Sequence, residues 1–245
     1  MKSTILPLII LTLYLSLPAF ANAKTEVSIE GGLTWQGRND QRIPESGGTT
    51  FALDEIDQGP FATYRIYASH KWSDRHEVRA LYAPLDLNLT GQFKNSIDYM
   101  GATFAANTDT QIRYKFNSYR LTYAYHFEKT SEWELALGFT TKVRDAEVSL
   151  TQGNLNRTKK NVGFVPLLNF QAVRNLSSMW LFRFDFDGLA APQGRAFDVA
   201  FFLERTLPDC GPRVFGGYRM VEGGADNKKV YNFAWFHTIV LGIRF

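Results

Sequence analysis

Large side chains alternate with smaller or more polar ones along residues 233–245, FAWFHTIVLGIRF. The alternating positions are Phe233, Trp235, His237, Ile239, Leu241, Ile243 and Phe245. A period of two residues puts such positions on one face of a β-strand. The pattern therefore predicts a strand with one apolar face.

The same alternation recurs in earlier segments, so the sequence predicts about ten strands, or eight if two of them merge. The other apolar phases run through 27–35, 62–72, 76–82, 119–127, 133–139, 164–170, 180–186, 197–203 and 214–220. An even number of antiparallel strands returns both ends of the chain to one side. We therefore expect an all-β fold, a closed antiparallel up-and-down barrel.

Short and long connections alternate between these strands. Ser73–Arg75 is a tight polar turn, whereas Arg38–Gly59 and Thr90–Thr110 are long segments rich in turn residues. The polar segment Gln152–Asn161 is also predicted as a loop. Short turns on one side and long loops on the other are typical of bacterial outer-membrane barrels.

One strand departs from the simple period. Tyr114 and Phe116 are out of phase with Tyr119, and a β-bulge near Asn117–Ser118 would restore the alternation. The sequence thus predicts a bulge at this point.

The opposite phase of the strands carries charges of both signs in nearly equal number. The acids are Glu26, Glu30, Glu77, Glu134, Asp185, Asp187, Asp198 and Glu204. The bases are Arg65, Lys71, Arg79, Arg120, Lys142, Arg144, Arg183, Arg219 and Arg244. Side chains fill the interior of a barrel of about eight strands, and buried charges must pair. We therefore expect a lumen packed with ion pairs.

All tryptophans fall in the apolar phase, near strand ends. Trp72, Trp133 and Trp180 lie beside short turns, and Trp35 and Trp235 lie where strands meet the long-loop side. Indole rings favour the boundary between lipid and water, so this distribution predicts two aromatic girdles. A soluble lipocalin-like barrel is the alternative, with the two faces exchanged.

The beginning of the sequence predicts export. Lys2, the apolar run Ile5–Phe20 and the small residues at 21–23 are typical of a cleaved signal peptide, which leaves 24–245 as one barrel domain. The single cysteine, Cys210, cannot form an internal disulfide and is interpreted as an incidental turn residue.

Composition narrows the class of protein. Aromatic residues make up 15% of the chain, yet the mean hydropathy is only −0.20 and no later apolar run reaches the length of a membrane helix. A net charge of +3 over 245 residues gives no reason to expect a nucleic-acid partner.

The final strand, with Ile239, Leu241, Ile243 and terminal Phe245, resembles the C-terminal sorting signal of Gram-negative outer-membrane β-barrels. The whole pattern resembles the small outer-membrane barrels of the OmpA-like and OmpW-like class. That resemblance implies residence in the outer membrane, contact with its lipid and lipopolysaccharide, and recognition of the last strand by the barrel-assembly machinery. It implies no cofactor, and a monomer is favoured.

One group of charged residues is a candidate ligand site. We expect its members to converge at the outer end of the lumen: Arg183, Asp185, Asp187, Arg195, Asp198, Arg219 and Glu222. An ion-paired plug is the favoured interpretation, and a polar pocket for a ligand or cation is the alternative.

The sequence shows no nucleotide-binding loop, zinc-ligand spacing or nucleophile elbow, so no catalytic or metal residue is predicted. Outer-membrane proteases place Asp beside His at the outer mouth, and no lumenal His is expected near the candidate aspartates. Outer-membrane lipid A deacylases pair a lipid-facing His with a Ser two positions on, and the residue two positions after His237 is Ile239.

These observations favour a non-enzymatic barrel whose long loops contact ligands or surfaces. A narrow passive channel for small solutes is the first alternative, and a lipid A-modifying enzyme is the second.

Overall fold

The computed structural model describes residues 24–208 and 211–245, and every regular element within these ranges is a β-strand. The predicted signal peptide, residues 1–23, and Cys210 lie outside the described residues. Among the described residues, no helix is long and apolar enough to cross a membrane. The strands are β1 (Lys24–Arg42), β2 (Phe51–Ala52), β3 (Phe61–Lys71), β4 (His76–Ala83), β5 (Asp86–Gln92), β6 (Ile97–Tyr99), β7 (Ala102–Phe104), β8 (Asp109–Lys129), β9 (Trp133–Gln152), β10 (Leu155–Asn175), β11 (Trp180–Ala191), β12 (Gly194–Thr206), β13 (Arg213–Asn227) and β14 (Val230–Arg244).

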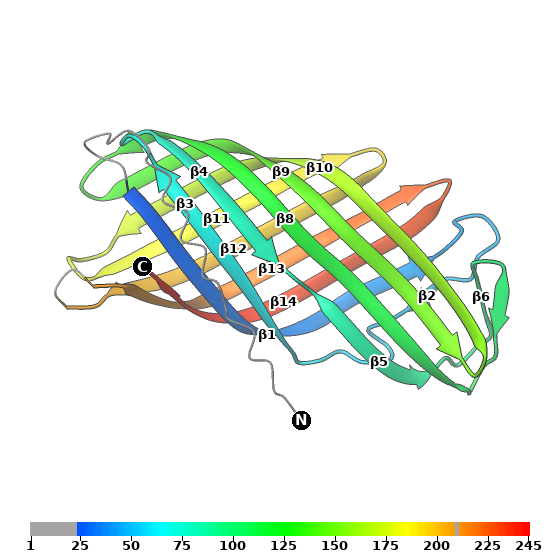
Figure 1. Ribbon diagram of the computed structural model, residues 1–245. Coiled ribbons are helices and arrows are strands. Elements are labelled where there is room, and N and C mark those ends of the chain that lie inside the picture. Colours follow the sequence, from blue (N-terminus) through cyan, green and yellow to red (C-terminus); the bar gives the residue numbers. More distant parts are fainter. Residues whose placement is uncertain (1–23, 209–210) are drawn as a thin grey trace, which may run out of the picture.

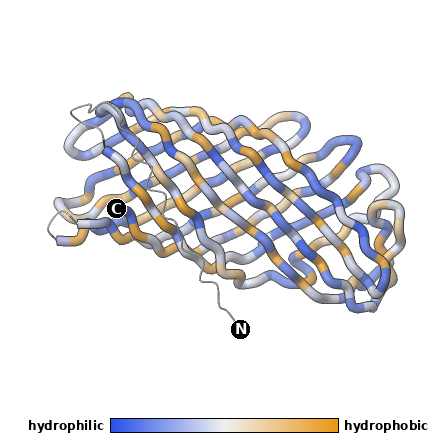
Figure 2. Tube along the Cα trace, in the orientation of Figure 1, coloured by the Kyte–Doolittle hydropathy of each residue, from blue (hydrophilic) through white to orange (hydrophobic). Residues whose placement is uncertain are grey.

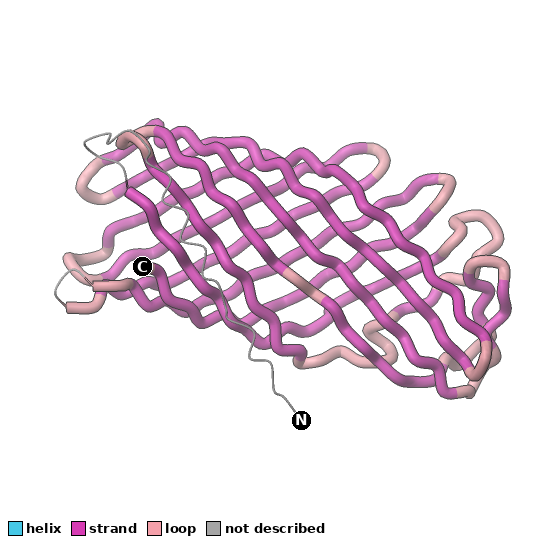
Figure 3. Tube along the Cα trace, viewed as in Figure 1, coloured by secondary structure: helices cyan, strands magenta, loops and turns pink. Residues whose placement is uncertain are grey.

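Antiparallel pairing closes these strands into a barrel with ten positions in its wall (Figure 1). β4 and β5 share one position because both pair with β8, and Pro84, which lacks a backbone N–H, interrupts the strand between them (Figure 3). β14 pairs with β1 from Ser28↔Arg244 to Arg42↔Tyr231, which closes the seam. The predicted closed barrel of ten strands is confirmed, and the alternative of eight is wrong.

The two ends of the barrel differ. The end that holds Lys24 and Phe245, here called the proximal end, also holds the connections 72–75, 130–132 and 176–179 and the described residues 207–208 and 211–212 between β12 and β13. The opposite, distal end holds β2, the β6–β7 hairpin and the tight turns 153–154, 192–193 and 228–229. Residues 152–161 were expected to form a loop, which is wrong because β9 and β10 stay paired up to Gln152↔Leu155. The two longer predicted loops are also partly strand.

The apolar face changes sides along β8. Tyr119, Leu121 and Tyr123 point outward and are 42%, 54% and 43% exposed, whereas Ile112 and Tyr114 point inward and are 2% and 4% exposed. The β8–β9 register runs unbroken from Gln111↔Thr151 to His126↔Ala136, so the bulge predicted near Asn117–Ser118 is wrong. A strand whose apolar residues change faces passes between two environments: apolar surroundings near the proximal end and water near the distal end.

The distal interior is consequently a hydrophobic core. Strand and loop residues share it: Ile43, Phe51, Leu53, Leu87, Leu89, Phe93, Ile97, Tyr99, Phe104, Ile112, Tyr114, Val148, Leu150, Ala234 and Phe236. The distal part of the barrel thus resembles a water-soluble barrel, and the β2 segment and the β6–β7 hairpin fill its end (Figure 1).

Nearer the proximal end, large apolar side chains cover the outside of the wall. This outward belt includes Ile29, Leu33, Tyr64, Ile66, Tyr119, Leu121, Leu137, Phe139, Phe164, Leu168, Phe182, Phe201, Ile239 and Leu241. Apolar and polar residues alternate along the strands (Figure 2). Trp133, Trp180 and Trp235 are 37%, 37% and 41% exposed, and Trp35 and Trp72 are partly exposed. Their membership of membrane girdles stays a prediction.

Candidate functional site

Charged residues from seven strands meet inside the proximal part of the barrel. We call this group the central ion cluster: Glu30, Arg65, Arg79, Arg120, Asp185, Asp187, Asp198 and Arg219. Strand alternation explains why they meet, because each lies on the phase opposite to the outward belt. The members are largely buried, so each charge depends on its neighbours for solvation.

Asp198 on β12 lies at the centre of the cluster. Its carboxylate accepts hydrogen bonds from Arg65 Nη2 at 2.7 Å and from Arg219 Nη1, and Arg120 Nη2 lies 2.8 Å from Oδ2. Arg219 also donates to Glu30 Oε1 at 2.9 Å, which joins β13 to β1. The three arginines around Asp198, together with Glu30, therefore hold together strands that are far apart in the sequence.

Asp187 on β11 extends the cluster towards the opposite wall. It accepts hydrogen bonds from Arg120 Nη1 at 2.9 Å, Thr140 Oγ1 at 2.7 Å and Asn169 Nδ2 at 2.8 Å. Thr140 and Asn169 are buried neutral residues that the sequence argument did not identify. Their inward phase was readable from the alternation, but an uncharged side chain carried no signal of a role there.

The cluster leaves little free space. A cavity of about 10 Å³ lies among Arg65, Arg79, Arg120 and Asp198, close to the smallest volume that holds one water molecule. Paired side chains therefore fill most of the interior at this level, and a second cavity of about 70 Å³ borders Glu30, Arg65, Arg120 and Arg219.

A second group of charges, the proximal ion layer, lies nearer the proximal end. Glu204 accepts from Arg183 Nε at 2.7 Å and from Arg244 Nη2 at 3.1 Å, and Arg213 bonds to Glu26 at 2.7 Å. A cavity of about 430 Å³ opens at this end of the lumen. His126 lines this cavity, 2.9 Å from Glu77 and 2.8 Å from Glu134.

The structure separates the predicted ligand cluster into three places. Asp185, Asp187, Asp198 and Arg219 lie in the central ion cluster, and Arg183 lies in the proximal ion layer. Arg195 and Glu222 face outward, because Arg195 alternates with buried Ala196 and Asp198 and Glu222 lies opposite Phe197. They bond to each other at 2.6 Å, beside Phe233. The expected convergence of all seven at the outer end of the lumen is wrong. Arg195 and Glu222 belong to the outward phase of their strands, and alternation does not fix the height at which Arg183 lies in the barrel.

Two distal segments that are far apart in the sequence form one surface: the segment around β2 and the segment around the β6–β7 hairpin. Thr49 N donates to Asp98 O at 2.9 Å, and Met100 N donates to Ile43 O at 3.1 Å. The ring of Phe51 packs edge-on against Phe93, with centroids 5.4 Å apart. A groove of about 340 Å³ lies between the segments, with Asp40, Glu55, Ile56, Phe93 and Lys94 among its lining residues.

The environment of the distal side chains is reflected in their pKa values. Burial raises the pKa of Tyr99, whose hydroxyl donates to Val148 O at 2.8 Å. The hydrogen bond from Arg113 lowers the pKa of Asp86, which lies on the water-exposed outside of β5. Both groups therefore keep their usual charge state at neutral pH.

The described residues hold no group of three His, Cys, Asp or Glu side chains suited to a metal ion. His237 points outward, and its Nδ1 lies 2.5 Å from the hydroxyl of Tyr218, with the Trp235 ring 4.8 Å away. Ile239, two positions on, is 56% exposed and has no nucleophilic atom.

Comparison with known proteins yields matches in structure alone. No protein-family model matches the chain, and no curated protein matches it in sequence. The outer-membrane protease OmpT from Escherichia coli has a TM-score of 0.56 at 10% identity, over 90% of this chain and 96% of OmpT. The attachment invasion locus protein Ail of Yersinia pestis has a TM-score of 0.41 at 8% identity, over 91% and 99% of the two chains. The similarity to OmpT shows that this chain has the fold of an outer-membrane β-barrel.

Proposed function

We propose that this protein is an integral outer-membrane barrel that does not conduct solutes and that displays its distal part outside the cell as a binding surface. The change of apolar face along β8 is the observation that carries the proposal. On the proximal side of Tyr119 the wall is apolar outside and ionic inside, as a lipid-embedded barrel requires. On the distal side of Tyr119 the wall is polar outside and apolar inside, as a water-exposed barrel requires.

This arrangement orients the protein in the membrane. The proximal end faces the periplasm, and the distal end, which holds the two long segments around β2 and the β6–β7 hairpin, projects from the cell. The outward belt contacts membrane lipid, and the outer rim near Trp35 and Trp235 contacts lipopolysaccharide. The last strand is recognised by the barrel-assembly machinery, and the folded protein is a monomer.

The filled lumen supports the non-conducting part of the proposal. A solute would have to displace Arg65, Arg120 and Asp198, which are held by several charge-assisted hydrogen bonds. A pore selective for one charge would line itself with one sign, whereas this cluster contains both.

The distal groove supports the binding part. Its walls come from two segments held together by backbone hydrogen bonds and aromatic packing, so its shape is set before a partner arrives. With room of about 340 Å³ and both acidic and basic side chains at its edge, it suits a sugar-sized or side-chain-sized group of a molecule at the cell surface.

Planar-bilayer recording tests the closed lumen. The folded wild-type protein is expected to give no single-channel steps, whereas Arg65→Ala with Arg120→Ala and Asp198→Ala opens the central ion cluster and is expected to conduct. Stable steps from the wild type would replace this proposal with the narrow channel.

An array of cell-surface glycans and peptides tests the groove. We expect binding by the wild type and loss of binding in Glu55→Ala with Lys94→Ala, two side chains that are 63% and 86% exposed and therefore dispensable for folding. Lys160→Ala, 71% exposed on the outside of β10, is the matched control. A wild type that binds nothing on the array, or binding that the groove variant retains, contradicts the proposal.

A further inference from the structure

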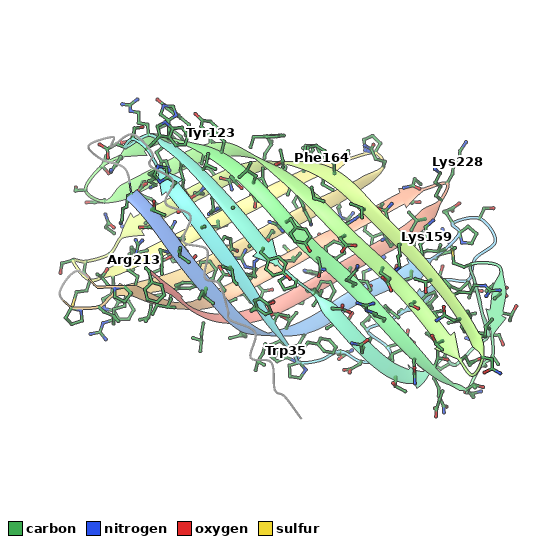
Figure 4. All side chains as sticks on the ribbon, viewed as in Figure 1. Trp35, Tyr123, Lys159, Phe164, Arg213 and Lys228 are labelled. Carbon is green, nitrogen blue, oxygen red and sulfur yellow. The ribbon has the colours of Figure 1, made fainter. Side chains whose placement is uncertain are left out.

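The wall of the barrel is incomplete beside the distal part of β10. Pairing between β10 and β11 begins at Leu168↔Gly188 and runs towards the proximal end. Over residues 155–167, the described pairings join β10 to β9 alone. The β9–β10 hairpin therefore extends past the β11–β12 hairpin (Figure 1), and Phe164 and Lys159 lie along the free edge (Figure 4).

A cavity of about 200 Å³ lies at this free edge. Its lining includes Phe116, Lys142 and Arg144 from the lumen, Phe164 and Pro166 from the edge of β10, and Leu189 from β11. We call it the side pocket. Because its lining comes from both faces of the wall, the pocket connects the lumen with the outside of the barrel.

The charge lining the side pocket has one sign. Lys142, Arg144 and Arg195 line it, and none of the described lining residues is an acid. Arg195 is neutralised by Glu222, which leaves two lumenal cations. The lining thus differs from the central ion cluster, where carboxylates and guanidinium groups alternate.

Lys142 and Arg144 are also the inward cations whose charge is not matched. Within the described ranges Lys142 forms neither a hydrogen bond nor a salt bridge, although it is only 3% exposed, and its amine lies 4.9 Å from the Phe116 ring centroid. Arg144 donates to the amide oxygen of Asn161, and its Nε is buried with no acceptor among the described residues. The inward arginines of the central ion cluster and proximal ion layer each have a carboxylate partner: Arg65, Arg79, Arg120, Arg183, Arg213, Arg219 and Arg244.

Buried cations without a counter-ion are costly, and a bound anion removes that cost. The outer side of the pocket is apolar and therefore favours an apolar part of the same ligand. Phe164, 64% exposed, lies opposite Val143 of the outward belt, and Leu189 is 37% exposed at the free edge. An apolar chain that leaves the pocket here enters the level of the lipid.

We infer that the side pocket binds an anionic amphiphile. Its carboxylate or phosphate head bonds to Lys142 and Arg144 inside the lumen, and its acyl chain passes the free edge of β10, over Phe164, Pro166 and Leu189, into the outer leaflet. This site lies apart from the distal groove, so it does not depend on the proposed surface binding.

Ligand titration of the full-length folded barrel in a zwitterionic detergent tests the head group and the chain together. Laurate and dodecyl phosphate are expected to bind saturably. Dodecyltrimethylammonium keeps the chain and reverses the charge, and butyrate keeps the head and shortens the chain. Both are expected to bind at least about tenfold more weakly than laurate. Tighter binding of laurate assigns the site to free fatty acids, and tighter binding of dodecyl phosphate assigns it to phosphorylated lipid.

Variants locate the site. Lys142→Gln with Arg144→Gln is expected to weaken laurate binding at least about tenfold. Arg113→Gln with Lys160→Gln, which removes two cations from the water-exposed outside of β8 and β10, leaves it unchanged. Equal binding of laurate and dodecyltrimethylammonium, or unchanged binding in the folded Lys142→Gln and Arg144→Gln variant, overturns the inference.

Photo-crosslinking of the wild-type protein gives a readout that does not depend on the folding of a variant. A laurate analogue with a terminal diazirine is expected to label residues 162–168 and 189–196. Labelling confined to the rest of the outward belt would show ordinary contact with lipid and overturns the inference.

Discussion

At the scale of single residues, the chemistry of this protein is dominated by buried charge. Asp198 is 3% exposed and lies against three arginines, so its removal leaves cations that water cannot reach. The exposed side chains of Asp86 and Arg113 are solvated by water whether or not they pair with each other. Their contact of 2.6 Å is nevertheless as short as that of Arg65 with Asp198, at 2.7 Å. The same pair of residue types therefore has a different energetic weight at the two sites.

Replacing Asp198 by Asn tests this difference. We expect Asp198→Asn to lower the free energy of unfolding by about 3–5 kcal/mol, because it leaves the four largely buried arginines of the central ion cluster with three carboxylates, Glu30, Asp185 and Asp187. Asp86→Asn is the matched control, with an expected loss of less than about 1 kcal/mol. Urea unfolding in lipid vesicles, followed by tryptophan fluorescence, measures both. A loss at Asp198 no larger than at Asp86 would show that the cluster tolerates a missing charge.

At the scale of elements, β8 shows that the surroundings of a strand decide which of its faces is apolar. From Gln111 to His126 its residues follow one unbroken alternation of faces, yet the apolar phase is outside at Leu121 and inside at Ile112. The sequence argument kept Tyr114 and Phe116 in the outward phase by a bulge near Asn117–Ser118. Both lie inward, as an apolar side chain does where the outside of the strand is polar. The same reasoning applies to residues 152–161, where polar side chains belong to solvated strands.

Arginine substitutions at two outward positions of β8 locate the boundary between these environments. Leu121→Arg places a charge in the outward belt, between Tyr119 and Tyr123, and is expected to cost about 2–4 kcal/mol. Gln111→Arg, ten positions away on the same face, is expected to change stability by less than about 0.5 kcal/mol. Vesicle unfolding gives both values, and equal costs would place the two positions in one environment.

At the scale of the whole molecule, the pairing of β1 with β14 converts a sheet into a closed barrel. Closure leaves no strand edge at that seam, whereas the distal part of β10 has an edge beside the side pocket. The central ion cluster also stabilises the closed barrel, because it connects strands that are not neighbours in the wall.

Engineered cysteines test the seam. Leu33 lies opposite Ile239, so Leu33→Cys with Ile239→Cys, in a Cys210→Ser background, is expected to form a disulfide in the folded protein. On a non-reducing gel, the boiled protein should migrate differently from its reduced form. Leu33→Cys with Ile243→Cys, out of register, is the control. Oxidation of both pairs to the same extent would contradict the register.

Alternation in the sequence, by itself, determined which residues of a strand share a face, and with it the ten strands. It did so because a strand turns every second side chain to the same side. The tertiary structure alone decided how high in the barrel each residue lies. Arg183 and Asp187 both point into the lumen from β11, yet Arg183 lies in the proximal ion layer and Asp187 in the central ion cluster. Height depends on strand tilt, register and the unequal lengths of β10 and β11, which are set by contacts across the whole barrel rather than within one segment.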